Sequence, residues 1–313
     1  MHAHQPDTFH NKSILFSALN WGYGHVMRSL VLLKKLVKQG NKLYVVGTEE
    51  QITLFKTEGL EASYIHQEGY PFQFGGNGNF SLDLFKNSSA LKQHFVREQK
   101  NVEQLCADFA IDLVIADQSL GFFSRKVPSI LITHQLNLPL SWWEKPAQWF
   151  YNKQVNNFQQ IWIPDQAPPN NLAGRLSETN RKNVTYIGWL SRFKEIPKVD
   201  KQFDVGVLVT GPQPYAQQFF EEMCKRFENS PEKVFIIYNG TNLRTHKNIV
   251  IFQHQATAEM AELLCSAELL ITRSGYSTLM DLNALRISNV ELQATLGQAE
   301  QLYLKKNWLS SKP

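Results

Sequence analysis

Short runs of apolar and β-branched residues alternate along the chain with stretches in which apolar residues recur every three or four positions. Such runs predict buried strands, and the three-to-four spacing predicts amphipathic helices. We expect strands over residues 13–20, 42–48, 111–117, 129–135, 160–165, 184–190, 203–211, 233–240, 249–255, 268–273 and 290–294. We expect helices over residues 26–40, 49–59, 81–109, 214–228 and 257–266, and one that begins near Ser277. This alternation predicts the α/β class, with parallel sheets and right-handed connections.

A charged stretch that contains proline interrupts the alternation after about residue 190. The 313 residues are enough for two domains of ~100–200 residues each. We therefore expect an N-terminal domain over residues 1–192, a linker over 193–202 and a C-terminal domain over 203–313. Because ligands commonly bind between two such domains, we expect the domains to face a cleft.

Composition and charge exclude several classes of protein. Hydrophobic residues make up 43% of the chain, which is too many for a disordered or fibrous protein. The formal net charge of +4 is far from the dense basic surface of a nucleic-acid-binding protein, so we expect no nucleic-acid partner. The three cysteines are widely spaced and predict neither a disulfide framework nor a zinc site. No uncharged apolar run reaches the ~18–20 residues of a membrane span, and we expect a soluble, cytoplasmic protein.

The turn between the first predicted strand and helix carries the first candidate chemistry. Gly22 and Gly24 let the backbone approach a ligand, and the helix N-terminus behind them favours an anion. Position 27 is Met rather than the third glycine of a dinucleotide-binding motif, which disfavours a nicotinamide-dependent dehydrogenase. His25 is our first candidate for a general base, since a neutral imidazole there accepts a proton. A tight turn without a ligand is the alternative.

Polar residues follow two predicted strands of the second half. Residues 210–212 form a strand-to-helix turn that can present N–H groups to phosphate. In residues 272–281, Arg273 follows a strand, and Ser277 and Asp281 lie one helical turn apart. An anion there would meet backbone N–H groups, hydroxyls and a guanidinium together. The alternative is a helix cap at Ser277 with Asp281 as an exposed charge.

Two aromatic segments are candidates for an acceptor-side surface. Residues 69–80 are rich in glycine and aromatic residues, and we expect a long functional loop there. Residues 140–150 contain Trp142, Trp143 and Trp149 beside Lys145. Aromatic residues next to basic ones suit a membrane interface, so we expect peripheral association with the inner face of the membrane. The alternative is that these side chains fill the core of the N-terminal domain.

Four short segments, three of them described above, together resemble parts of the nucleotide-sugar glycosyltransferases of the GT-B fold, near glycosyltransferase family 28. That family includes the N-acetylglucosaminyltransferase of lipid II synthesis. Residues 22–25 are similar to its N-terminal glycine-rich loop, residues 210–213 to its first C-domain phosphate loop, and residues 273–281 to its Arg-x-Gly segment. Residues 297–301 are similar to the segment that contacts the donor sugar. Residues 132–137, 161–165 and 186–193 resemble an uncharacterised bacterial branch.

The resemblance implies two Rossmann-like domains that face a cleft. It also implies a metal-independent, inverting transfer of a hexose or N-acetylhexosamine from a UDP-sugar to a glycan or lipid-linked acceptor, with no cofactor. We expect His25 to be the base, with Asp117 and His134 in reserve because both lie at the ends of predicted strands. The resemblance implies that Asp281 holds the ribose hydroxyls. The residues expected to bind the donor are Gly22, Gly24, Thr210, Gly211, Arg273, Ser274, Gly275, Ser277, Thr278, Asp281, Gln298, Glu300 and Gln301.

The chain departs from the family pattern near its C-terminus. Leu296 stands where the family commonly has proline, and the sequence stops at Pro313, so we expect the C-terminal domain to lack its last helix. Two other functions stay open. One is an enzyme like the UDP-N-acetylglucosamine 2-epimerases, which share the fold; the loop at residues 69–80 weighs against it, because an epimerase has no acceptor to bind. The other is a non-catalytic nucleotide-sugar-binding protein.

Overall fold

The chain divides into two compact units. The computed structural model describes residues 5–76, 78, 80–140, 145–240, 247–295 and 297–310. The first unit comprises Met1–Gln73 and Ser81–Leu190, and the second comprises Phe74–Phe80 and Ser191–Pro313. Residues 193–202, where we expected a linker, are part of the second unit. Among the described residues, no helix is long and apolar enough to cross a bilayer.

The first unit is built on a parallel sheet with the strand order β3-β2-β1-β4-β5-β6-β7. The strands are β1 (Ser13–Ala18), β2 (Lys42–Gly47), β3 (Ser63–His66), β4 (Leu113–Asp117), β5 (Ser129–Ile132), β6 (Gln160–Ile163) and β7 (Val184–Tyr186). The helices are α1 (Tyr23–Lys38), α2 (Glu49–Thr57), α3 (Phe80–Asp108) and α4 (Lys145–Val155), with 3-10 turns at Pro6–Thr8 and Gly174–Leu176. The order places β4 beside β1, with Asp117 in register with Ala18.

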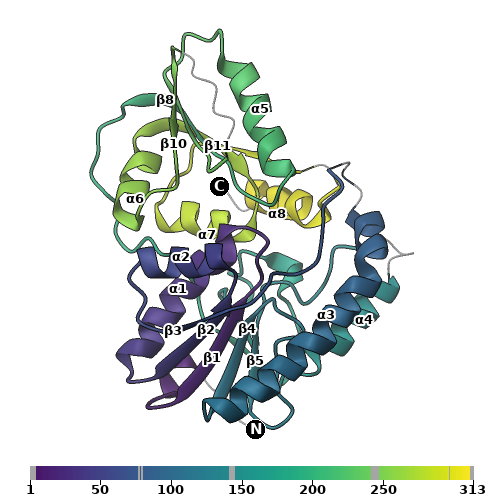
Figure 1. Ribbon diagram of the computed structural model, residues 1–313. Helices are drawn as coiled ribbons and strands as arrows, with labels where there is room; N and C mark the ends of the chain where they lie inside the picture. Colours follow the sequence, from purple (N-terminus) through teal and green to yellow (C-terminus); the bar gives the residue numbers. More distant parts are fainter. Residues whose placement is uncertain are drawn as a thin grey trace. The chain divides into compact units, whose positions relative to one another are not determined.

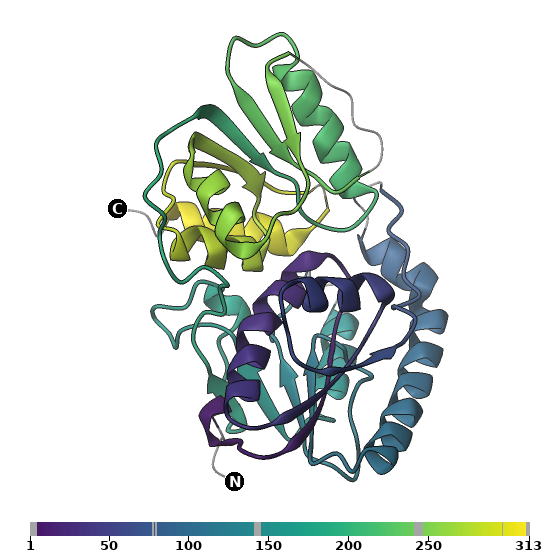
Figure 2. The ribbon, with the colours of Figure 1, turned by 60° about the vertical axis from the view of Figure 1, so that its left-hand side comes forward.

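Alternate residues of the central strands enter two separate cores, one on each face of this sheet. Ile14 and Phe16 of β1 pack with Leu30 and Leu33 of α1 on one face. Leu15, between them in the sequence, packs on the opposite face in the core that contains α3 and α4 side chains. Figures 1 and 2 show α1 and α2 along one face and α3 and α4 along the other. Burial on both faces explains why these strands read as continuous apolar runs.

The second unit repeats the arrangement on a smaller scale. Its parallel sheet has the order β10-β9-β8-β11-β12. The strands are β8 (Phe203–Leu208), β9 (Val234–Ile237), β10 (Ile249–Phe252), β11 (Ala267–Arg273) and β12 (Val290–Gln293). The helices are α5 (Tyr215–Phe227), α6 (Thr257–Cys265), α7 (Tyr276–Ala284) and α8 (Ala299–Ser310). β8 and β11 are parallel neighbours, and each is followed by one of the two predicted phosphate-binding turns. Because the carboxyl ends of parallel strands share one edge of a sheet, both turns lie at the same edge.

Part of the predicted acceptor loop packs inside the second unit. The Phe74 ring contacts the Tyr215 ring, with centroids 5.9 Å apart, and the Gly78 N–H donates to the Tyr215 hydroxyl at 3.2 Å. Gly297 has a φ of +76°, and a Cβ there would overlap the Gly78 carbonyl. We expected the whole loop at residues 69–80 to belong to the N-terminal domain, but its residues 74–80 belong to the second unit.

The predicted elements agree with the structure in type, and most differences lie at strand ends. The predicted strands 129–135 and 203–211 end in the structure at Ile132 and Leu208, because their last residues form the turns at the carboxyl edge. β3 was not predicted. It is a four-residue edge strand, whose pattern is too short to stand out from a loop.

Candidate functional site

His25 lies in the first turn of α1, directly after the predicted glycine-rich turn. Gly22 precedes the helix with a φ of +98°, which a glycine adopts without strain. Gly24 is the second residue of α1, so its N–H belongs to the first turn, whose N–H groups have no intrahelical partner. Arg28 and Ser29 follow at the spacing that brings side chains to the same helix face as His25.

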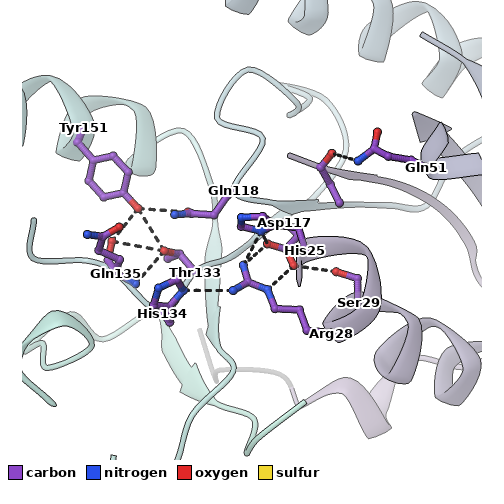
Figure 3. Close-up of polar contacts among 11 residues, drawn as sticks. His25, Arg28, Ser29, Gln51, Asp117, Gln118, Thr133, His134, Gln135 and Tyr151 are labelled. Carbon is purple, nitrogen blue, oxygen red and sulfur yellow. Dashed lines mark hydrogen bonds and ion pairs between the residues drawn. The ribbon is translucent and has the colours of Figure 1, made fainter. Parts of the chain in front are cut away.

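These side chains meet the carboxylate of Asp117, at the end of the neighbouring strand β4 (Figure 3). His25 Nδ1 lies 2.9 Å from Asp117 Oδ1. Arg28 Nε donates to Oδ2 at 2.7 Å, and its Nη2 donates to Oδ1. The Ser29 hydroxyl also donates to Oδ2, at 2.7 Å. Asp117 is fully buried and Arg28 is 2% exposed, so this ion pair is shielded from solvent screening.

Burial and charge act together on the two titratable groups. Burial lowers the pKa of His25, and the Arg28 charge lowers it further, while Asp117 acts in the opposite direction. Burial alone would raise the pKa of Asp117, but the Arg28 charge and the hydrogen bonds from Arg28 and His25 outweigh burial and hold it well below its usual range. His25 is therefore neutral at pH 7, and Asp117 is a carboxylate.

His134 completes the cluster from the turn that follows β5. Its Nδ1 lies 3.2 Å from Arg28 Nη1. The neighbouring Thr133 is held by Tyr151, whose hydroxyl lies 3.2 Å from Thr133 Oγ1 and donates to the Gln135 carbonyl at 2.8 Å. The three expected catalytic residues thus come together around one arginine (Figure 3).

The cluster changes the role of one predicted residue and adds another. Asp117 was a reserve base, but its oxygens already accept from Arg28, Ser29 and His25, which suits an orienting carboxylate rather than a free base. Arg28 was missed. The sequence did hold an indication of its role, because Arg28 stands among the apolar residues of the helix predicted over residues 26–40. A charged side chain on the apolar face of a helix is expected to be buried.

In the second unit, Arg273 lies buried at the end of β11 beside the turn that follows β8. Its Nη2 donates to the Tyr215 carbonyl at 2.6 Å, and its guanidinium lies over the Phe219 ring. Its Nη1 is buried without a hydrogen-bond partner in the part of the chain that the structure describes. A Cβ on Gly211 would lie 3.6 Å from Nη1, so this donor is next to the predicted phosphate turn. Burial lowers the pKa of Arg273 to about 10, which leaves it charged at pH 7.

The residues between Arg273 and α7 do not all have the expected role. The N–H of Ser274 donates to the Gln293 carbonyl at 2.9 Å, and its hydroxyl donates to the Gln301 carbonyl at 2.7 Å. Both donors have partners inside the fold, which leaves Ser274 with less capacity to bind a diphosphate than we expected. Gly275 is the N-cap of α7, which places Ser277 and Thr278 in its first turn, and Thr278 is buried. Ser277 is therefore not the N-cap considered in the sequence analysis.

Asp281 lies on α7 one turn after Ser277, as predicted. The Ser191 hydroxyl donates to its Oδ1 at 2.6 Å. Burial raises the pKa of Asp281 to about 6, although Ser191 and the Arg192 charge act in the opposite direction. A carboxyl group with one hydroxyl donor already in place is suited to accept hydrogen bonds from further hydroxyls.

The polar residues just before α8 and in its first turn mainly hydrogen-bond to one another. Gln301 Oε1 accepts from the Thr295 N–H at 2.8 Å, and its Nε2 donates to Gln298 Oε1. Glu300 is partly buried in the first turn of α8. This network supports the turn at Gly297 and leaves Gln301 with less free hydrogen-bonding capacity than we expected.

The predicted aromatic surface is divided in the structure. Phe72 packs on Trp21, with ring centroids 4.7 Å apart, whereas Phe74 belongs to the second unit. Trp142 and Trp143 lie outside the described residues, as does the side chain of Lys145. Trp149 on α4 is 68% exposed. Membrane association therefore stays a prediction, which co-sedimentation with anionic vesicles at low salt tests.

Glu98 on α3 is a buried acid outside the His25 cluster. It lines a small polar pocket together with the loop after β3, where the Tyr70 hydroxyl donates to its Oε2 at 3.1 Å and Gln67 Nε2 donates to its Oε1 at 3.4 Å. His94 Nε2 lies 3.9 Å from Oε1. Burial raises the pKa of Glu98 to about 7, because its effect outweighs that of the hydrogen bonds from Tyr70 and Gln67, which lower the pKa.

We expect Glu98→Gln to stabilise the protein above neutral pH. Folding raises the pKa of Glu98 from 4.5 to about 7. Between these two pH values the folded state binds more protons than the unfolded state does. The contribution of Glu98 to the free energy of unfolding is therefore lost as the pH rises through about 7. That rise in pKa corresponds to ~3 kcal/mol. Urea unfolding at pH 8 should show the variant more stable by up to ~3 kcal/mol, and the two proteins should converge near pH 4.5. The exposed Glu61→Gln serves as control. A variant less stable at pH 8 would contradict the prediction.

Among the described residues, no group of three or more His, Cys, Asp or Glu side chains is arranged to hold a metal ion. No protein-family model matches the chain, and no curated protein matches it.

Solved structures do resemble it. One is the glycotransferase of kitacinnamycin, at 14% identity over 96% of this chain and 84% of that one, with a TM-score of 0.60. Another is the spinosyn rhamnosyltransferase SpnG complexed with thymidine diphosphate, at 14% identity over 95% of this chain and 84% of that one, with a TM-score of 0.61. A third is Arabidopsis thaliana UGT89C1 complexed with UDP-L-rhamnose, at 13% identity over 97% of this chain and 84% of that one, with a TM-score of 0.61. At these identities the likeness shows the fold alone, and the chain has the α/β GT-B fold, with two Rossmann-like units.

Proposed function

We propose that this protein transfers a sugar from a nucleotide-sugar donor to a hydroxyl group of an acceptor, with His25 as the general base. The observation that carries the proposal is the 2.9 Å contact between His25 Nδ1 and Asp117 Oδ1 at the carboxyl edge of the first sheet. A carboxylate only accepts hydrogen bonds, and we therefore assign the ring proton to Nδ1, which leaves the lone pair on Nε2. The fold shared with solved glycosyltransferases supports this class of reaction.

In the proposed step, His25 Nε2 takes the proton of the acceptor hydroxyl while the hydroxyl oxygen bonds to the anomeric carbon of the donor. The bond from that carbon to the diphosphate oxygen breaks, and the nucleoside diphosphate leaves with the electron pair. Attack from the side opposite the leaving group inverts the anomeric configuration. Asp117 orients the ring and stabilises the imidazolium that forms, as a buried carboxylate does in other base–acid pairs.

We place the nucleotide site in the second unit. Arg273 supports this assignment, because a buried charged donor without a described partner lies beside the Gly211 turn, where backbone N–H groups can also meet a diphosphate. We propose that the donor is a UDP-linked hexose or N-acetylhexosamine, that the transfer needs no metal, and that a glycan or lipid-linked hydroxyl is the acceptor. Asp281 would accept from the ribose hydroxyls.

Incubation with UDP-sugars and crude lipid or sugar acceptors tests the proposal, with mass spectrometry of the products. A glycosylated acceptor together with released UDP is the expected result. An epimerised donor sugar would favour the epimerase alternative. Thermal stabilisation by a UDP-sugar without any turnover would favour a non-catalytic binding protein.

We expect Asp281→Ala to weaken UDP-glucose binding by at least ~10-fold, since a hydrogen bond to a charged group is worth ~1.5–3 kcal/mol. Binding should also weaken in the wild type as pH falls through about 6, because protonation removes the stronger, charged acceptor. Asp281→Asn should lack that pH dependence. Isothermal titration calorimetry measures both effects. Glu268→Ala, at the exposed opposite end of β11, is the control, and unchanged affinity in Asp281→Ala would remove this residue from the site.

A further inference from the structure

The guanidinium of Arg28 contacts three side chains that come from three different elements. It donates through Nε and Nη2 to Asp117 of β4, it lies 3.0 Å from His25 Nδ1 of α1 through Nη2, and its Nη1 lies 3.2 Å from His134 Nδ1 after β5. Nothing in the proposed step uses this cation directly. A buried charge at the centre of the cluster nevertheless determines where the neighbouring protons lie.

The proton positions follow from counting donors and acceptors. Guanidinium nitrogens only donate, and the Asp117 carboxylate only accepts. His25 Nδ1 lies 2.9 Å from an acceptor, Asp117 Oδ1, and 3.0 Å from a donor, Arg28 Nη2. We assign the ring proton to Nδ1, pointing toward Asp117, because Arg28 Nη2 already donates to the same carboxylate oxygen. In the neutral ring the lone pair is then on Nε2.

His134 is placed the opposite way. Its Nδ1 faces an Arg28 N–H at 3.2 Å, so Nδ1 accepts, and the neutral ring carries its proton on Nε2. The two imidazoles on either side of Arg28 are therefore opposite tautomers. At Nε2, His25 accepts a hydrogen bond and His134 donates one. The acceptor at His25 Nε2 suits a hydroxyl group, which can donate its proton there.

Arg28 is also the counter-ion of Asp117. An unpaired carboxylate hydrogen-bonded to a histidine favours the protonated imidazolium and raises its pKa. Asp117 already has a counter-ion in Arg28, which donates to both of its oxygens. The groups that face His25 are Asp117 from β4, Arg28 from its own helix and His134 from the turn after β5.

We propose that Arg28 is a positioning residue that keeps His25 an unprotonated acceptor at Nε2, which suits a hydroxyl substrate, and that it fixes His134 as the opposite tautomer. The link to a substrate rests on the proposed function. The tautomers and the protonation of His25 do not, because they can be measured in the protein without any substrate.

Histidine side-chain ¹⁵N NMR of the full chain tests the proposal, with signals assigned by His25→Gln and His134→Gln variants. In the wild type we expect His25 with its proton on Nδ1 and His134 with its proton on Nε2. In Arg28→Met, the pKa of His25 should rise above its wild-type value, because the Arg28 charge no longer lowers it and Asp117 is then unpaired. Arg28→Lys keeps the charge and should restore the low pKa of His25.

Lys35→Met removes an exposed cation from the same helix and should leave His25 unchanged. If the reaction is as proposed, the acid limb of the kcat/KM profile in Arg28→Met should move to higher pH by the same amount, with activity recovered at pH 9. The wild-type tautomers are read in the unaltered protein, with the two glutamine variants used only for assignment. A wild-type His25 with its proton on Nε2 would overturn the proposal. A pKa of His25 in Arg28→Met that stays at the wild-type value would also overturn it. The expected NMR result without any sugar transfer would instead refute the proposed function alone.

Discussion

Replacing His25 by alanine should lower kcat by at least ~100-fold, the usual contribution of a positioned base. The affinity for UDP should not change, because the proposed nucleotide site is built from residues of the second unit. The loss should be in kcat and kcat/KM together, as for an interaction made only in the transition state. Initial rates of UDP release from a UDP-sugar with an accepted hydroxyl substrate measure this.

Two further variants make the His25 result specific. His66→Ala removes an exposed histidine at the end of β3 and should have no effect on turnover. A merely structural role for His25 would lower thermal stability or donor affinity instead of kcat. Normal turnover in His25→Ala would contradict the assignment, and His134 would then be the next residue to test. Asp117 is a poor candidate because its carboxylate is paired with Arg28.

Asp117→Asn should destabilise the protein by ~3–5 kcal/mol, the usual cost of leaving one partner of a buried ion pair without its counter-ion. The substitution keeps the shape of the side chain, so little of the loss comes from a cavity. It leaves Arg28, which is almost fully buried, as an uncompensated cation. Urea unfolding at pH 7 measures the change in the free energy of unfolding.

A double-variant cycle tests that explanation. Arg28→Met combined with Asp117→Asn removes both charges and should recover part of the stability lost in Asp117→Asn alone. Asp112→Asn, an exposed acid just before β4, should change stability by less than ~1 kcal/mol. Equal stability of Asp117→Asn and the wild type would mean that the pair contributes nothing.

The sequence by itself determined the architecture. Apolar runs on doubly buried strands and helices with one apolar stripe are local patterns, and they predicted the α/β class and most elements. Because ligands bind at the carboxyl ends of parallel strands, sequence position also predicted His25, Asp117 and His134 as candidates for the base, and the structure brings the three together. Asp281, one turn after Ser277, followed in the same way from helix geometry.

Only the tertiary structure decided what these side chains do. Arg28 acts through partners 89 and 106 residues away in the sequence, and no local pattern specifies such contacts. The same holds for Ser274, whose donors are used by carbonyls at Gln293 and Gln301, and for Phe74, which packs in the second unit. Hydrophobic periodicity reflects which face of an element is buried, whereas proton positions and charge pairing depend on which distant polar groups meet there.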